Sequence, residues 1–261
     1  MTDRRDFFSA NASIYDDRSG ALLADDEAQD LARAARLDPD GTILDVGAGT
    51  GRVAIPLARA GFQVVAVDTA LPMLDVLGRK APDLRVRRIA ASGSRLPFQS
   101  ACFDAAVIAR LLYLLSDWRD LLRDAIRVVR PGGRILHEWN NGAPDEEWVQ
   151  IKEKARELFE AAGVANPFHP GARRESEVEE CLLGEGVIHR GGIQMAADFQ
   201  MTLGEFLDRI AAGKFSYTWN VPPGVLPGCL TQLRAWASAS FDLDRPVPVP
   251  RERSWKIYEA T

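Results

Sequence analysis

Short apolar runs alternate with stretches of helical periodicity through the first half of the chain. Residues 43–46, 64–67 and 103–109 are rich in branched aliphatic and small side chains and have the length of strands buried on both faces. Between 121 and 129 the apolar residues recur at helical spacing, and a Pro-Gly-Gly segment separates them from a further apolar run over 134–139. This alternation predicts an α/β fold with a doubly wound, mostly parallel sheet.

The two ends of the chain add mostly helical patterns to this core. Apolar residues within 1–36 predict one or two amphipathic helices that pack over the site described below. The elements predicted beyond residue 140 are helices over 145–162, 175–183, 202–212 and 225–241, a sixth strand over 187–201, and a last strand over 254–258 that lies antiparallel at the sheet edge.

A glycine-rich loop follows the first predicted strand. Gly47, Gly49 and Gly51 leave the turn without Cβ atoms, so a ligand can lie against bare peptide N–H groups. A helix is expected to begin at Gly51 or Arg52 and to aim its first amides at the same place. Asp68 ends the next strand, about twenty positions after Gly47, where a carboxylate can accept hydrogen bonds from both hydroxyls of a ribose. Together they predict a site for a nucleoside-bearing cofactor.

The glycine spacing separates two classes of nucleoside cofactor. Dinucleotide sites use G-x-G-x-x-G, whereas this loop reads G-x-G-x-G and places Arg52 where the third glycine belongs, which argues against nicotinamide and flavin dinucleotides. The sequence Asp45-Val-Gly-Ala-Gly-Thr-Gly51 resembles the first motif of the S-adenosylmethionine-dependent methyltransferases of the seven-strand, Rossmann-like class. Segments 69–74 and 91–98 are similar to later landmarks of that class, and the resemblance spans roughly residues 40–140.

The resemblance implies a fold, a cofactor and a set of binding residues. The fold is an α/β, doubly wound, Rossmann-like sheet of seven strands, mostly parallel with an antiparallel last strand, with N-terminal helices and a helical insertion after the fifth strand. The cofactor is S-adenosyl-L-methionine, which leaves as S-adenosyl-L-homocysteine. The residues expected to bind it are Tyr15, Asp45, Gly47, Ala48, Gly49, Gly51, Asp68, Thr69, Met73, Ser92, Gly93, Ser94, Ala109 and Arg110.

Three of these expectations have alternatives. Met73 either covers the adenine, as the resemblance implies, or fills the core at a helix start. Tyr15 either belongs to a lid above the methionine part of the cofactor or packs within a helix. Ser92, Gly93 and Ser94 stand where the class usually carries an acidic residue for the adenine amino group, so backbone groups and Ser hydroxyls would have to read the base.

No catalytic residue is assigned by the sequence. Methyl transfer from a sulfonium needs alignment and a dry site, and it needs a general base only where the acceptor must lose a proton. The candidates at the carboxyl edge of the sheet are Tyr113, His137 and Glu138, with Asn140 and His169 as further polar groups. His137 and Glu138 are neighbours on a strand and face opposite sides, so at most one of them faces the cleft. Without a base, a nitrogen or sulfur acceptor is favoured.

Composition and charge narrow the class of protein. The chain has 261 residues, of which 46% are hydrophobic and 26% charged, enough for a sizeable core without disulfides or metals. Its three cysteines form no C-x-x-C pair, so no metal site is expected. A net charge of −5 disfavours nucleic acid as a partner, and the basic residues Arg85, Arg87 and Arg88 are read as a solvated sheet edge. No apolar run approaches the roughly 20 residues of a membrane span, and the predicted location is the cytoplasm.

The sequence therefore predicts four parts and one principal function. Residues 1–36 form a helical lid, 37–140 the cofactor-binding Rossmann-like core, 141–186 a helical insertion that caps the substrate, and 187–261 the completion of the sheet with further helices. The function is transfer of a methyl group from S-adenosylmethionine to a small-molecule acceptor. An RNA or protein methyltransferase and a noncatalytic S-adenosylmethionine-binding protein are the alternatives. The aromatic connector 214–219 either clasps the acceptor or anchors the C-terminal helices.

Overall fold

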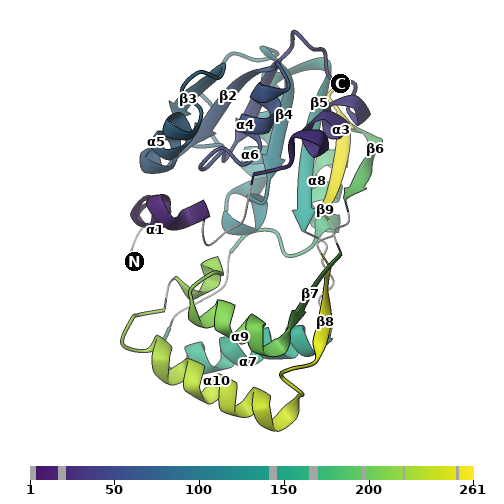
Figure 1. Cartoon of the computed structure of the whole chain (residues 1–261). Helices are drawn as coiled ribbons and strands as arrows, with labels where there is room; N and C mark the ends of the chain where they lie inside the picture. The colour runs from purple at the N-terminus through teal and green to yellow at the C-terminus, as the bar shows by residue number, and fades with distance from the viewer. Residues whose placement is uncertain are drawn as a thin grey trace.

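The computed structural model shows two lobes, a larger one built on a sheet and a smaller, mainly helical one that we call the cap (Figure 1). The structure describes residues 4–16, 22–140, 146–164, 170–195, 198–219, 221–250 and 253–261. The chain ends in the larger lobe, beside the last strand of the sheet (Figure 1).

A seven-stranded sheet forms the centre of the larger lobe. Its strands are β1 (Thr42–Val46), β2 (Gln63–Asp68), β3 (Val86–Ala90), β4 (Phe103–Ala109), β5 (Val129–Asn140), β6 (Ile188–Met195) and β9 (Arg253–Glu259). The spatial order is β3-β2-β1-β4-β5-β9-β6. Strands β1 to β5 run parallel, and β9 lies antiparallel to both of its neighbours. The prediction of a seven-stranded, doubly wound, Rossmann-like sheet with an antiparallel last strand is confirmed.

Helices cover both faces of this sheet. In the larger lobe they are α1 (Arg4–Asn11), α3 (Asp25–Ala34), α4 (Ala54–Arg59), α5 (Leu71–Lys80), α6 (Trp118–Val128) and α8 (Glu175–Gly184), with the short 3-10 turns η1 (Ala12–Ile14) and η2 (Leu112–Leu114). One buried apolar cluster joins α3, α4 and α5 to one face, and a second joins α6 and α8 to the other. The branched aliphatic strands predicted from the sequence supply residues to both clusters, since side chains alternate along a strand.

Two details of the strand prediction were wrong. The last strand, β9, lies between β5 and β6 and not at the edge. Its residues explain this position, because Trp255 and Ile257 belong to one buried cluster and Tyr258 to the other, so the strand is covered on both faces. The strand predicted over 187–201 is two strands: β6 ends at Met195, and the next strand belongs to a separate sheet.

The cap has a hydrophobic core of its own. It consists of α7 (Glu146–Ala161), α9 (Leu203–Ala211), α10 (Leu226–Ser240), the 3-10 turn η3 (Ser216–Thr218) and the two-stranded sheet of β7 (Asp198–Thr202) and β8 (Pro246–Pro250). Trp148 of α7 stacks on Phe206 of α9, with ring centroids 4.0 Å apart, and Leu233 of α10 is buried in the same cluster. The cap thus draws α7 from the predicted insertion and the rest from the segment after β6, whereas α8 of the insertion packs on the larger lobe.

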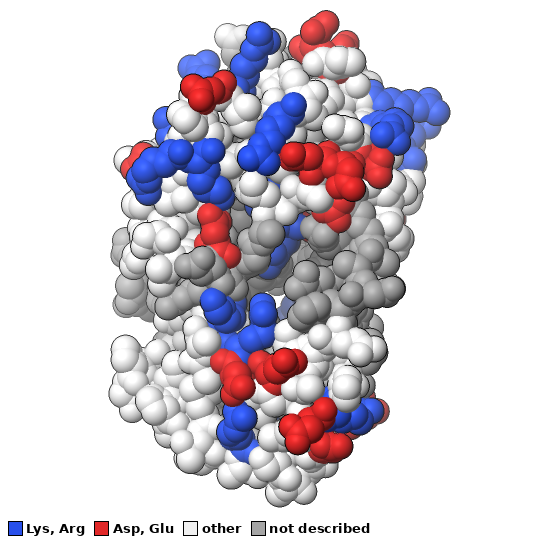
Figure 2. Space-filling view, viewed as in Figure 1, with Lys and Arg blue, Asp and Glu red and all other residues white. Residues whose placement is uncertain are grey.

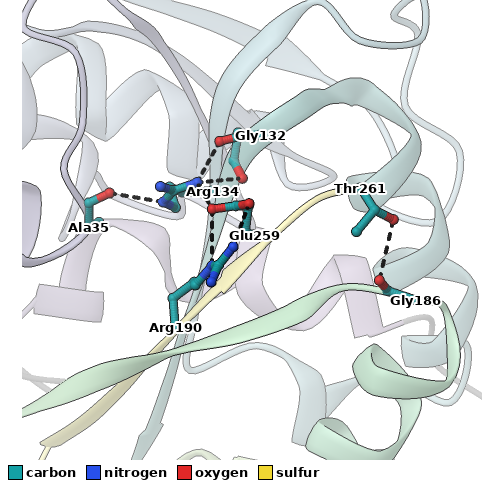
Figure 3. A network of polar contacts seen from close by, with 8 residues as sticks. Ala35, Gly132, Arg134, Gly186, Arg190, Glu259 and Thr261 are labelled. Carbon is teal, nitrogen blue, oxygen red and sulfur yellow. Dashed lines mark hydrogen bonds and ion pairs between the residues drawn. The ribbon is translucent and has the colours of Figure 1, made fainter.

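A polar network holds the antiparallel strand β9 at the end of the sheet where β5 begins (Figure 3). Glu259 at the end of β9 accepts from Arg190 of β6 at 2.9 Å and 3.1 Å and pairs with Arg134 of β5 at 2.8 Å. The Arg134 side chain also donates to the carbonyls of Ala35 and Gly132 (Figure 3). The network therefore joins three strands and the end of α3 at the amino end of β5. It does not occupy the carboxyl ends of the parallel strands.

Candidate cofactor and acceptor site

A cavity of about 370 Å³ lies at the carboxyl ends of β1, β2 and β4. In the sheet, β1 is paired with β2 on one side and with β4 on the other, and the chain order reverses at β1 and β4. In open α/β sheets ligands bind at such a reversal, outside the carboxyl ends of the strands. This edge of the sheet faces the cap, since β5 leads into α7 (Figure 1).

The glycine loop forms the floor of the cavity. The amides of Gly47 and Ala48 both donate to the Val67 carbonyl of β2, at 2.8 Å and 3.0 Å, so the loop is held against the neighbouring strand. Gly47 has a φ of +74°, and a Cβ there would lie within 2.6 Å of the Leu111 side chain. Gly49 also has a positive φ, +54°, but the space where its Cβ would stand contains no protein atom within 4 Å. Gly49 therefore keeps a path open for a ligand, and Gly47 allows the loop to pack.

Asp68 lines the cavity at the end of β2, as the sequence predicts. Its carboxylate accepts from the amide of Gly49 at 2.9 Å and from that of Ala70 at 2.8 Å. Burial raises the pKa of Asp68, and the amides of Ala70, Gly49 and Thr69 oppose that rise. The same carboxylate thus fixes the geometry of the glycine loop and lines the cavity.

Asp45 is a buried carboxyl beneath the loop. It is 2% exposed, and one of its oxygens, Oδ2, has no hydrogen-bond partner among the described residues. Burial raises the pKa of Asp45 to about 7, opposed mainly by the Ala54 amide at the start of α4. The helix begins there, two to three residues later than predicted. A buried oxygen without a partner beside a cavity is a ready acceptor for a ligand donor.

The structure brings most of the predicted cofactor residues into this one cavity. Those that line it are Tyr15, Asp45, Gly47, Ala48, Gly49, Asp68, Thr69, Met73, Ser92, Gly93, Ala109 and Arg110. Gly51 and Ser94 do not. A Cβ on Gly51 would meet Leu77 and Ile55 side chains within 3 Å, so this glycine serves packing. The Ser94 hydroxyl lies 2.9 Å from that of Ser92, which does line the cavity.

None of the three base candidates lines the cavity. Glu138 is fully buried, and its two oxygens accept from the Arg52 guanidinium at 2.6 Å and 2.8 Å. This bidentate pair commits the carboxylate to Arg52, which does line the cavity. His137 points away from Glu138, as alternation requires, and burial, with the nearby Lys256 charge, lowers the pKa of its imidazole to about 3. Burial raises the pKa of Tyr113, so its phenol keeps its proton at neutral pH.

An N-terminal lid closes one side of the cavity. Phe8, Tyr15 and Asp16 line it from α1 and the residues after η1. The Asp16 carboxylate accepts from the Thr50 hydroxyl of the glycine loop at 2.5 Å and from Lys80 Nζ of α5 at 2.8 Å. Lys80 Nζ also donates to the Thr50 carbonyl at 3.0 Å. We call this three-residue group the lid latch, because it joins the lid to the loop that forms the cavity floor.

The aromatic connector of the cap anchors the C-terminal helices, one of the two uses predicted for it, and its last ring contacts the lid. Tyr217 is buried in the cap core and stacks with Phe215 at a centroid distance of 5.5 Å. Trp219 instead contacts the lid, with ring centroids 5.9 Å from Phe8 and 6.0 Å from Tyr15. The connector therefore anchors the cap helices and also carries one ring across to the lid.

Sequence reasoning missed several residues of the site. Asp16, Thr50 and Arg52 all line the cavity but were not predicted to. Thr50 and Arg52 stand inside or next to the recognised motif, and that position was the available signal. Their partners Lys80 and Glu138 are 30 and 86 positions away in sequence, which no local pattern reveals.

Two negative findings apply to the described residues. Within them, no helix is long and apolar enough to cross a membrane. Nor does this part of the chain gather three or more His, Cys, Asp or Glu side chains where they could hold a metal ion.

The fold and the cavity together have the arrangement of a Rossmann-like domain that receives a nucleoside-bearing ligand at its topological switch point. Comparison with known families agrees with this class. Residues 44–137, from β1 into β5, match the family described as "Methyltransferase domain". This part of the chain is thus similar to methyltransferase domains.

Curated relatives share part of the chain. A demethylmenaquinone methyltransferase of Renibacterium salmoninarum is 40% identical over 98 residues, which is 38% of this chain and 40% of the relative. A protein of the same name from Clavibacter sepedonicus is 37% identical over 134 residues, 49% of this chain and 54% of the relative. The matched part thus spans about half of these relatives or less.

Solved structures share the fold over most of the chain. The YcgJ protein of Bacillus subtilis has a TM-score of 0.59 at 18% identity, covering 89% of this chain and 97% of that one. A Haemonchus contortus phosphoethanolamine N-methyltransferase 2 has a TM-score of 0.56 at 18% identity, covering all of this chain and 61% of that one. The cyclase SpnF has a TM-score of 0.57 at 19% identity and covers 90% of this chain and 80% of that one. At these identities the likeness concerns the fold.

Proposed function

We propose that this protein is an S-adenosylmethionine-dependent methyltransferase that acts on a small organic acceptor. The observation that carries the proposal is the joint position of the open Gly49 and the Asp68 carboxylate in one cavity, within the segment that matches the methyltransferase family. The relatives named demethylmenaquinone methyltransferase support methyl transfer to a small molecule.

The residues present fit the cofactor. Asp68 would accept from the ribose hydroxyls, and the unpartnered Oδ2 of Asp45 would accept from a donor on the methionine part above the loop. Met73 is 1% exposed and lines the cavity, so it fills the core and covers the ligand space at once. Ser92 and Gly93 line the cavity where they would border the adenine. Twelve of the fourteen predicted residues thus surround one space of suitable size.

A bound S-adenosylmethionine would supply an electrophilic methyl group on its sulfonium, with S-adenosylhomocysteine as the leaving group. The protein's part is to align the acceptor and exclude water. The cavity beyond Ala109 is lined by the apolar side chains of Leu111, Leu114, Leu115 and Leu121. These side chains help both to align the acceptor and to exclude water. Of the three base candidates, Glu138 is paired with Arg52, and burial lowers the pKa of His137 and raises that of Tyr113, so none of them is placed to take a proton from the acceptor.

Relatives do not define the acceptor. The family match ends at residue 137, before the cap begins at α7, and the cap packs around its own core. The cap and the lid meet at the contact of Trp219 with Phe8 and Tyr15. The cap and the lid, which lie outside the family match, therefore contribute to the choice of acceptor.

Two measurements test the proposal. Calorimetric titration with S-adenosylhomocysteine and with NADH should show binding of the first alone. Incubation with methyl-labelled S-adenosylmethionine and fractionated cell extract should place label in low-molecular-mass metabolites. Label in RNA or protein would support the corresponding alternative, and binding without transfer to any fraction would support a noncatalytic protein.

A further inference from the structure

Two helices of the cap, α7 and α9, begin at the same place and lead away from β7 and β8 (Figure 1). Glu147 in the first turn of α7 pairs with Arg245, and the residue that caps α9 lies opposite Pro246 in the β7–β8 sheet. Close to these starts, the rings of Trp148 and Phe206 stack with centroids 4.0 Å apart. The side chains one turn beyond the two rings are therefore neighbours across the helix pair.

Lys152 is the residue one turn beyond Trp148 on α7. The helix α10 packs on the other flank of α7, where Lys154 Nζ lies 5.9 Å from the centre of the Trp236 ring. At 3.6 residues per turn, Lys152 lies about 160° round the helix from Lys154. Its neighbour Glu153 lies about 100° away from it. Lys152 therefore stands on the flank of α7 that faces away from α10.

Arg209 is the residue one turn beyond the stacked ring of α9, at the junction between the cap and the lid. Its carbonyl accepts from the Lys214 amide at 3.0 Å. The Gly213 carbonyl accepts from Trp219 Nε1 at 2.7 Å, and the Trp219 ring lies 6.0 Å from that of Tyr15, which lines the cofactor cavity. Lys and Arg side chains gather on the face of the cap that borders the hollow between the lobes (Figure 2).

Within the part of the chain that the structure describes, the charged groups of Lys152 and Arg209 have no hydrogen-bond or ion-pair partner. The two acidic residues of α9 are engaged elsewhere: Glu205 accepts from a backbone amide at the helix start at 2.9 Å, and Asp208 pairs with Arg234 of α10 at 2.6 Å. Lys152 keeps an exposed surface, yet the protein around it lowers its pKa by burial, and Arg209 is half-buried. Partly desolvated cations attract an anion more strongly than fully hydrated ones do.

Half-buried rings lie between these cations and the cofactor cavity. Phe215 packs edge-on against Phe206, with ring centroids 5.3 Å apart, and Trp219 follows it in the connector. Both rings keep exposed surface, and Trp219 contacts the lid residues that line the cavity. The flat apolar part of a ligand can lie along such rings while its charged end reaches the cations.

We propose that Lys152 and Arg209 form a binding site for an anionic group, a carboxylate or a phosphate, which the methyl acceptor carries away from the atom that is methylated. The guanidinium supplies a planar fork of donors and the ammonium a compact charge, and both suit these groups. The site lies outside the residues that match the methyltransferase family and outside the cofactor cavity. The identity of its ligand as the acceptor rests on the proposed function, whereas anion binding itself is measurable without the cofactor.

The test is a binding measurement with matched probes, made with and without S-adenosylhomocysteine. The protein is titrated at neutral pH with benzoate, phenyl phosphate and the neutral benzamide. We expect the wild type to bind at least one of the two anions about tenfold more tightly than benzamide, the size of one charge-assisted contact. Tighter binding of phenyl phosphate would identify a phosphate site, and tighter binding of benzoate a carboxylate site. Lys152→Met combined with Arg209→Gln should remove the preference, and Lys152→Arg combined with Arg209→Lys should keep most of it.

Controls separate this role from folding and from general charge. Lys154→Gln and Arg234→Gln remove cations from the other side of the same helices and should leave the preference intact. The Lys152→Met, Arg209→Gln variant should keep the wild-type affinity for S-adenosylhomocysteine within about threefold. No preference in the wild type, a preference that survives in this variant, or an equal loss in the two controls would overturn the proposal.

A second readout concerns the acceptor itself. The low-molecular-mass product labelled in cell extract should be retained by an anion-exchange resin at neutral pH, and label confined to the unretained fraction would overturn the assignment of the anion to the acceptor. Failure of the wild type to bind S-adenosylhomocysteine, with the anion preference present, would instead overturn the proposed function.

Discussion

Replacing Asp45 by Asn should stabilise the protein, and more strongly as the pH rises. The carboxyl is buried beneath the glycine loop, and one of its oxygens has no partner among the described residues. Burial is the main cause that raises its pKa from 3.8 to about 7. The folded state therefore holds this proton more tightly than the unfolded chain does. Below pH 3.8, the unfolded pKa, Asp45 does not lower the free energy of unfolding. Between 3.8 and about 7 it lowers that free energy increasingly, and above about 7 by a constant amount.

The magnitude follows from that difference in pKa. At about 1.4 kcal/mol for each pH unit, the step from 3.8 to about 7 amounts to about 4 kcal/mol of unfavourable free energy once Asp45 is ionised in the folded state. At about pH 5.5 the cost is about 2 kcal/mol, and at about pH 8.5 it has reached its full value. Asn is close to Asp in shape and cannot ionise, so the variant does not have this unfavourable free energy. The stability advantage of Asp45→Asn should accordingly grow by about 2 kcal/mol between these two pH values.

Urea unfolding of both proteins at the two pH values measures this growth. Asp104→Asn is the matched control, because burial of Asp104 is outweighed by the Arg130 guanidinium and the Thr42 amide, so its pKa is lowered. The Asp104 carboxylate loses its stabilising effect only in acid. Asp104→Asn should therefore lower the free energy of unfolding by the same amount at both pH values. A pH-independent gap between wild type and Asp45→Asn would refute the argument that this carboxyl is desolvated at a cost.

Three further predictions concern the cofactor. Asp68→Ala should weaken S-adenosylhomocysteine binding by roughly 1–3 kcal/mol through lost hydrogen bonds to the ribose, and unchanged affinity by calorimetry would mean that the ribose lies elsewhere. Gly49→Val should abolish that binding, because its side chain would enter the open space above the loop at a φ of +54°; a calorimetric titration with normal affinity would contradict the placement. Lys80→Met, which removes the partly exposed ion pair to Asp16, should weaken the same binding by about 0.2–1 kcal/mol and speed chymotryptic cleavage next to Tyr15; equal cleavage rates would show that the lid latch does not hold the lid.

The cofactor-binding half of the molecule was predictable because its signals are local. Branched aliphatic strands covered on both faces, a glycine loop and an acidic residue at the next strand end each lie within a short stretch of sequence. Their relative positions then follow from the rules of parallel sheets, which bring the carboxyl ends of β1 and β2 together. Asp68 consequently meets the amide of Gly49 as expected of the motif.

The parts that were missed depend on contacts between distant segments. The strand that carries Trp255 and Tyr258 was predicted at the sheet edge, although its large residues at both odd and even positions were the sign of burial on both faces. Glu138, a candidate base, forms an ion pair with Arg52. The two residues are far apart in sequence, so no periodic pattern predicts their pairing. From the sequence, Trp148 is predicted only to lie in a helix. Its packing on Phe206 shows that this helix belongs to the cap and not to the larger lobe.

Separate interiors for the two lobes have an evolutionary consequence. Among the described residues, side chains that fill the cap, such as Phe206 and Leu233, belong to a different buried cluster from those around the glycine loop. Substitutions in distant, independently packed regions combine nearly additively, so drift in the cap leaves the loop's stability unchanged. New acceptor preferences can therefore arise in such a chain one residue at a time, on a cofactor platform that stays constant throughout.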